Sequence, residues 1–131
     1  MSEQERQNKE LVKKGYEAFS AGDIKSVLGL FDDNIEWVQP GDTAISGTYH
    51  GKTEVLEYIG RLAEKSVTVT LKRLVAEGDT VVALTDVAVG GERGQNADVF
   101  TLRDGKAVRV QVHTDTAIME RVYGRKKHAA A

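Results

Sequence analysis

Asp98 is the acidic residue whose neighbours in the sequence best suit proton-transfer chemistry. It alternates with Phe100 and Leu102 along a strand-like run, so the three side chains share one face of that strand. Two of the three are apolar, which indicates that this face points inward. An isolated buried carboxyl has a raised pKa and stays protonated, so that it can donate a hydrogen bond to a ligand carbonyl. The alternative is that Asp98 lies half exposed at the start of the strand and bonds a loop amide.

Tyr16 is the second polar candidate. It lies on the apolar stripe of a helix expected over residues 3–20, together with Val12 and Phe19. Its phenol either points into a cavity or belongs to a core tyrosine whose hydroxyl finds any buried partner. In a reaction, Asp98 would act as acid or base and Tyr16 would stabilise a developing oxyanion.

His113 and Asp115 form a lower-ranked pair. They lie two residues apart on a last strand expected over 107–118, so they face the same side at roughly 6.6 Å. A histidine oriented by an aspartate is a candidate general base. The opposite face of that strand carries Val110 and Val112, and valines suit the wall of an apolar cavity. We therefore expect the histidine face to point outward or against another subunit.

The sequence indicates no cofactor and no metal site. The three histidines, His50, His113 and His128, lack the i,i+4 or His-x-His spacing of metal ligands. Cysteine is absent, which removes disulfides, thiol nucleophiles and thiolate ligands. The glycine-rich segment 90–94 lies between two expected strands, whereas a phosphate-binding loop leads from a strand into a helix.

The composition limits the classes of partner that we expect this protein to bind. The chain has 131 residues, the size of one domain, and a net charge of −2, which argues against nucleic-acid binding. It has no apolar run long enough to span a membrane and no apolar stretch typical of a signal peptide near Met1. We expect a cytoplasmic protein with one domain at residues 1–123 and a short, basic, flexible tail at 124–131.

The elements that position these residues place the chain in the α+β class. Helices come first and strands joined mainly by hairpins follow, a pattern that puts helices against one face of a mostly antiparallel sheet. A curved sheet with helices across its concave face encloses a cone, whose open end leaves a ligand-sized cavity. Further helices are expected after Asp23, with Phe31 on the apolar stripe, and over 52–64; strands are expected over 34–39, 67–76, 80–89, 97–103 and 107–118; and a loop is expected over 41–51.

Four segments resemble the SnoaL-like and ketosteroid-isomerase-like families of the nuclear-transport-factor-2-like superfamily. They are Tyr16–Ile24 (YEAFSAGDI), Phe31–Trp37 (FDDNIEW) followed by Pro40, Tyr49–Lys52 (YHGK) and Val99–Val108 (VFTLRDGKAV). The resemblance implies a cone-shaped roll in which a curved sheet wraps around three N-terminal helices. It also implies a homodimer formed through the outer face of the sheet.

The resemblance also implies which residues of this chain occupy the catalytic positions of the related families. The general base of the steroid isomerases falls at Gln39, an amide that takes no proton at neutral pH. Their oxyanion hole, a tyrosine with a protonated aspartic acid, matches Tyr16 and Asp98. The arginine of limonene-epoxide-hydrolase-like relatives falls at Asn96. The sequence thus resembles an isomerase site that keeps its hydrogen-bond donors and lacks its base.

Further residues complete the expected pocket. A supporting tyrosine of the isomerases falls at Ile59, next to Tyr58. Trp37 alternates onto the same strand face as Gln39 and is either the pocket floor or core. The full set of expected ligand-binding residues is Trp37, Gln39, Val55, Tyr58, Ile59, Phe100, Val110 and Val112.

Two functions follow from these observations, and whether the protein is an enzyme stays open. In the first, the cone binds a small, mostly apolar molecule bearing a carbonyl or hydroxyl, with cofactor-independent isomerisation, cyclisation, dehydration or hydrolysis as the reaction. The alternative is a non-catalytic dimeric binding or assembly module whose cone is filled by side chains. Its contacts would be Arg109, Gln111, His113 and Asp115. An open pocket with Asp98 at its base favours the first function.

Overall fold

The computed structural model describes residues 1–127, which form four helices and six strands within that range. In chain order the elements are α1 (Glu3–Ser20), α2 (Ile24–Gly29), β1 (Phe31–Gln39), β2 (Gly47–His50), α3 (Gly51–Ala63), β3 (Thr68–Glu77), β4 (Thr80–Val89), β5 (Glu92–Arg103), β6 (Lys106–His113) and α4 (Thr116–Tyr123).

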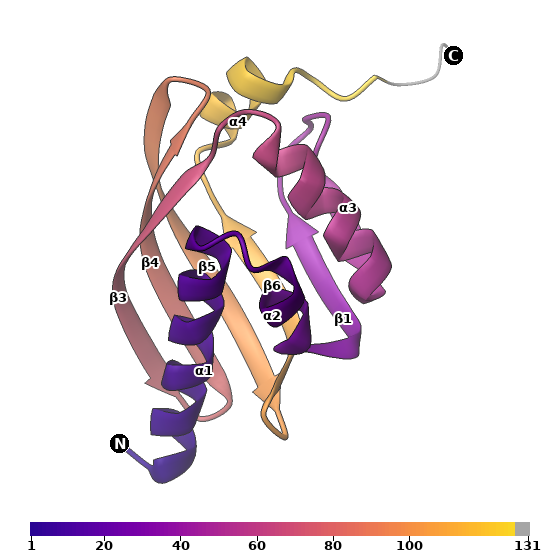
Figure 1. Ribbon diagram of the computed structural model, residues 1–131. Coiled ribbons are helices and arrows are strands. Elements are labelled where there is room, and N and C mark those ends of the chain that lie inside the picture. The colour runs from indigo at the N-terminus through magenta and orange to yellow at the C-terminus, as the bar shows by residue number, and fades with distance from the viewer. Residues whose placement is uncertain (128–131) are drawn as a thin grey trace.

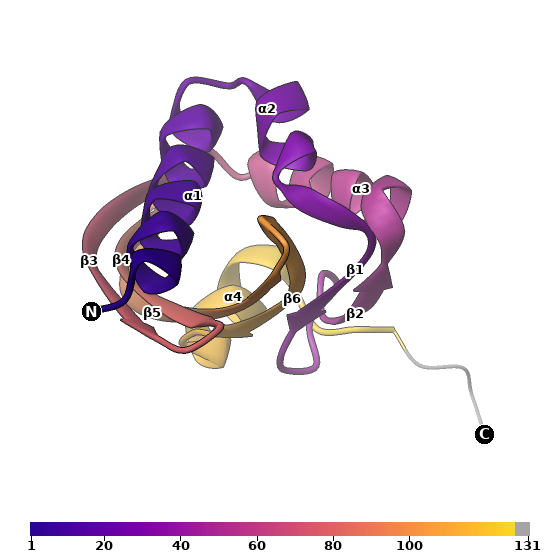
Figure 2. The same ribbon diagram turned by 90° about the horizontal axis from the view of Figure 1, so that it is seen from below.

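The strands form one curved sheet in the order β2-β1-β6-β5-β4-β3. β1 and β6 are parallel, and every other neighbouring pair is antiparallel. α1 packs over β3 and β4, whereas α3 packs over β1 and β2. Figures 1 and 2 show the result, a sheet that curls around α1, α2 and α3, with α4 across one end of the roll. The expected α+β roll is confirmed.

Local sequence explains where α1 begins and how it is held. Ser2 and Glu5 form a capping box, in which each side chain accepts a hydrogen bond from the backbone of the other residue. The Glu5 carboxylate also accepts from the backbone N–H of Gly78, at 2.8 Å, in the β3–β4 turn. The cap therefore ties the start of the helix to the sheet that it covers.

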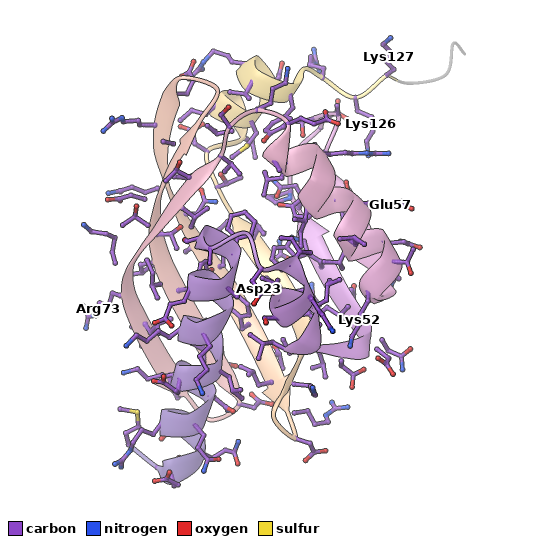
Figure 3. The ribbon with its side chains drawn as sticks, viewed as in Figure 1. Asp23, Lys52, Glu57, Arg73, Lys126 and Lys127 are labelled. Atoms are coloured by element: carbon purple, nitrogen blue, oxygen red, sulfur yellow. The ribbon has the colours of Figure 1, made fainter. Side chains whose placement is uncertain are left out.

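The core lies between the helices and the concave face of the sheet. Alternation along β4 and β5 turns Val81, Ala83, Phe100 and Leu102 inward, as expected for a sheet with one buried face. At the start of α3, Lys52 pairs with Asp33 of β1 at 3.4 Å. Figure 3 labels Lys52 at this end of the helix.

Several expected element boundaries differ in the structure. The second helix ends at Gly29, and Phe31 starts β1 instead of continuing the helical stripe, because it pairs with Ala107 of β6. The expected loop at 41–51 contains β2, which forms by pairing with β1. β5 begins at Glu92, five residues earlier than expected, because its whole length pairs with β4.

The expected last strand at 107–118 is wrong beyond His113. Asp115 is the N-cap of α4, and its side chain accepts from the backbone N–H groups of Ala117 and Ile118. Ile118 and Met119 are buried by the helix that follows. None of the described helices is long and apolar enough to cross a membrane.

The predicted tail is held in place over its first residues. Gly124 and Lys126 make backbone hydrogen bonds with Ala44 and Asp42 of the β1–β2 connection. The Lys126 ammonium also donates to the Ser46 carbonyl at 2.9 Å. Figure 3 labels Lys126. The flexibility of the tail stays a prediction, and His128 with the three alanines lies outside the described residues.

Candidate functional site

A cavity of about 110 Å³ lies inside the roll. All four helices and every strand except β2 contribute to its lining, which is mostly apolar. Leu11, Phe19, Val27, Leu62, Val69 and Met119 are among the apolar residues that face it. The cone is therefore not filled by its own side chains, and the polar groups in its wall gain chemical importance because they are few.

Tyr16 and Asp98 meet in the wall of this cavity. The Tyr16 hydroxyl donates a hydrogen bond of 2.6 Å to Asp98 Oδ2. The Tyr16 ring also packs edge-on against Phe100, with ring centroids 5.9 Å apart, which fixes the phenol. Asp98 is 8% exposed, and its Oδ1 has no partner among the described residues. One carboxyl oxygen is thus occupied and the other is free for a ligand.

Burial sets the protonation of this pair. It raises the pKa of Asp98 to about 6, although the Tyr16 hydrogen bond and the charge of His113 act in the opposite direction. Burial and the negative charge of Asp98 raise the pKa of Tyr16, so the phenol keeps its proton. The shift of Asp98 has the expected direction, but at neutral pH most of the carboxyl is ionised. It can therefore exchange a proton near pH 7.

A second hydrogen-bonded pair joins α3 to β1. The Tyr58 hydroxyl donates to Gln39 Oε1 at 2.6 Å, and both residues are almost fully buried. Gln39 Nε2 is buried and has no partner among residues 1–127. Glu57, next to Tyr58 on α3, points away from the sheet (Figure 3), as expected for the two faces of an amphipathic helix.

Aromatic rings surround Tyr58. Trp37 and Tyr49 lie with their ring centroids 5.5 Å and 4.9 Å from that of Tyr58. Burial raises the pKa of the Tyr58 hydroxyl, the charge of Asp98 adds to this rise, and the nearby Trp37 indole opposes it. The indole Nε1 nevertheless makes no hydrogen bond of good geometry within the described part of the chain.

Strand register places the two pairs in one row. In the parallel β1–β6 ladder Val38 pairs with Gln111, so the next residue, Gln39, lies level with Val112. Val112 in turn pairs with Asp98 of β5. Gln39, Val112 and Asp98 are all buried and all line the cavity. The amide and the carboxyl therefore stand on either side of a valine, with backbones roughly 10 Å apart at the usual strand spacing.

Comparison with known proteins supplies the family. The sequence profile of the SnoaL-like domain matches residues 12–110, which is most of the chain. The chain belongs to the SnoaL-like domain family. An uncharacterised protein of Mycobacterium tuberculosis is 29% identical to this SnoaL-like domain over 101 residues, covering 77% of this chain and 69% of the relative.

Solved structures agree with this assignment. A nuclear-transport-factor-2-like protein of unknown function from Burkholderia pseudomallei superimposes with a TM-score of 0.82 at 26% identity, covering 94% of this chain and 98% of the other. TerC, co-crystallised with polyporic acid, gives a TM-score of 0.81 at 25% identity, covering 88% of this chain and 97% of TerC. The SnoaL-like fold suggests ligand binding or cofactor-independent catalysis in general.

The structure of this SnoaL-like domain brings most of the expected site residues together. Eight of them line the cavity, namely Tyr16, Trp37, Gln39, Tyr58, Ile59, Phe100, Asp98 and Val112. Val55 and Val110 do not line it, because both are fully buried in the packed core. Residues on the inward-pointing face of a strand or helix lie at different depths in the core, and only some of them reach the cavity.

The lower-ranked pair does not form. His113 is exposed at the end of β6, and Asp115 is exposed as the cap of α4, so the two residues do not share a strand face. The chain turns between them because Asp115 starts a helix. Within residues 1–127, no three His, Asp or Glu side chains are grouped as a metal site would require.

Several lining residues lie outside the expected set, notably those of α1 and α4. The apolar stripe of α1 supplies Leu11 and Phe19 beside Tyr16, and the same periodicity that predicted the helix could have assigned them to the wall. Met119 comes from α4, whose first residues, 116–118, were expected to belong to the last strand. Asp115, followed by the helix formers Ala117, Met119 and Glu120, was the available signal.

Proposed function

We propose that the cavity binds a small, mostly apolar molecule carrying a carbonyl or hydroxyl group, and that Asp98 exchanges a proton with it without a cofactor. The observation that carries this proposal is the Tyr16–Asp98 hydrogen bond of 2.6 Å in an apolar cavity, with Asp98 Oδ1 left free. Perturbed carboxyls in apolar pockets are typical of sites that handle protons.

The dimensions support a compact ligand. An apolar cavity of about 150 Å³ engineered in another protein binds benzene, so a cavity of about 110 Å³ suits a molecule with one ring. Apolar contacts supply affinity in such a site, and the few polar groups set orientation. The co-crystallisation of TerC with polyporic acid supports a ligand for this chain as well.

Asp98 has the properties of an acid/base group. Tyr16 donates to Oδ2 and thereby orients the carboxyl, while the raised pKa of about 6 leaves a protonated fraction beside the ionised majority near neutral pH. Isomerisation, cyclisation, dehydration and hydrolysis can all use such a group. The open cavity favours this function over an assembly module whose cone is filled by side chains. A homodimer is compatible with the proposed binding function.

The test is a thermal-unfolding screen with small ketones, phenols, epoxides and polyketide fragments. Asp98→Asn keeps the shape of the side chain and removes its charge. Asp86→Asn is the matched control, because Asp86 lies half exposed on β4 and pairs with Lys72 at 3.7 Å. At a hundredfold excess over Kd a ligand stabilises the native state by about 2.7 kcal/mol, which a melting curve detects.

We expect at least one compound class to raise the melting temperature of wild type and of Asp86→Asn, and to lose most of that effect in Asp98→Asn. Active compounds are then assayed for turnover. The proposal is wrong if no class raises the melting temperature, or if the increase is the same in Asp98→Asn as in wild type.

A further inference from the structure

Gln39 carries an unused hydrogen-bond donor inside the cavity wall. The residue is 3% exposed, it lines the cavity, and its Nε2 has no partner among the described residues. A buried amide N–H without a partner destabilises the fold, by an amount that a ligand acceptor can recover. The unsatisfied group therefore points to a ligand atom rather than to a role in packing.

Tyr58 determines which end of the Gln39 amide is free. Burial keeps the Tyr58 hydroxyl protonated, so it has one hydrogen to donate, and the carbonyl oxygen of Gln39 is 2.6 Å away. The indole of Trp37 lies beside Tyr58, with ring centroids 5.5 Å apart, and partly offsets the rise in the Tyr58 pKa that burial causes. The hydrogen of Tyr58 is therefore directed to Gln39 Oε1, which leaves the NH₂ group for the cavity.

The opposite wall has the opposite character. Asp98 uses Oδ2 to accept from Tyr16, and its free Oδ1 is an acceptor whenever the carboxyl is ionised. Across Val112, in the same row, β1 presents the side-chain NH₂ group of Gln39 without a hydrogen-bond partner in the described range. The cavity thus has a donor group on its β1 side and an acceptor on its β5 side.

We propose that Gln39, oriented by Tyr58, is the specificity-determining donor of this cavity, so that the ligand carries a hydrogen-bond acceptor at its Gln39 end and a donor at its Asp98 end. This inference rests on the proposed function, because it names the chemical class that the same site takes. The class is a compact apolar molecule with a carbonyl at one end and a hydroxyl, or another group that gives a proton, at the other.

Four single-ring probes of similar size separate these contributions. Ethylbenzene has no hydrogen-bonding group, acetophenone adds an acceptor, 4-ethylphenol adds a donor, and 4-hydroxyacetophenone has both. Dissociation constants from NMR titration are compared for wild type, Gln39→Glu and Tyr58→Phe. Gln95→Glu is the matched control, since Gln95 lies exposed on β5 and outside the cavity lining.

The expected result is an order of affinity. Wild type and Gln95→Glu bind 4-hydroxyacetophenone most tightly, and they bind acetophenone about tenfold more tightly than ethylbenzene, as one additional hydrogen bond allows. Gln39→Glu replaces the free donor with an acceptor and removes the advantage of acetophenone, while 4-ethylphenol binds as before or better. Tyr58→Phe lets the amide turn, so the preference for acetophenone over 4-ethylphenol falls several-fold.

A changed preference in Tyr58→Phe distinguishes positioning from a purely structural role, which would weaken all four probes alike. That variant also serves if Gln39→Glu does not fold. The inference is overturned if acetophenone and ethylbenzene bind wild type equally, or if both variants keep the wild-type order of probes. Failure of all four probes to bind wild type would overturn the proposed function together with this inference.

Discussion

The buried Asp98 carboxyl lowers the stability of the folded state at neutral pH. Its folded-state pKa of about 6 lies above the ordinary value of 3.8, because burial disfavours the charged carboxylate. The folded state therefore holds this proton more tightly than the unfolded state does. The resulting contribution to stability is fully present below pH 3.8 and is lost as the pH rises through about 6.

Asp98→Asn should therefore stabilise the protein at neutral pH. A difference of about two pKa units corresponds to roughly 3 kcal/mol, so we expect a gain of this order in the free energy of unfolding at pH 7.5. At pH 4 the gain should be close to zero, because the wild-type carboxyl is then protonated in the folded state. Urea unfolding at the two pH values measures both, and an equal effect at each would contradict the account.

Single-residue reasoning predicted part of this site. Alternation along 98–102 placed Asp98 inward, and the helical stripe placed Tyr16 inward, because both patterns depend only on local geometry. Their common site, which joins residues 82 positions apart, followed only from the resemblance, and the hydrogen bond between them was not predicted. The depths of Val55 and Val110 could not be predicted, because they depend on how all layers pack.

Among the elements, α4 shows best how a local pattern can mislead. Thr114, Thr116 and Ile118 continue the alternation of β6 and favour a strand on propensity. The capping hydrogen bonds of Asp115 and the burial of Met119 favour a helix instead. Similarly, β2 has no periodic signal of its own and exists because the edge of β1 is available for pairing.

Asp115→Ala should weaken this helix start and leave the cavity chemistry unchanged. Loss of the two capping hydrogen bonds from Ala117 and Ile118 should cost about 1 kcal/mol in the free energy of unfolding. Asp115→Asn keeps an accepting oxygen and should cost much less. Chemical denaturation measures the free energy of unfolding, and the ligand screen measures binding. A large loss of binding without a loss of stability would instead indicate that Asp115 belongs to the site.

On the scale of the whole molecule, the sheet has two different faces. Its concave face carries the cavity, whereas its outer face carries an apolar row of Val75, Val82 and Val99, which are neighbours in the register of β3, β4 and β5. Leu84, beside this row, is 38% exposed. Exposed apolar residues gathered on one face are typical of interfaces, and we propose that this face forms the expected homodimer.

Leu84→Lys should therefore weaken self-association at least tenfold. Leu56→Lys is the control, because Leu56 has a similar exposure, 44%, but lies on the outer side of α3. Sedimentation velocity across a range of concentrations measures the dissociation constant of each variant. Monomeric wild type, or an equal effect of the two substitutions, would show that the outer sheet face is not the interface.

The account depends most on Asp98 being a buried carboxyl that titrates near neutral pH. The direct measurement is a pH titration of its side-chain ¹³C resonance by NMR, in wild type and in Tyr16→Phe. We predict a midpoint of about 6 in wild type and a higher midpoint in Tyr16→Phe, because the lost hydrogen bond had favoured the charged form. A wild-type midpoint near 3.9, the value of an exposed aspartate, would contradict the account.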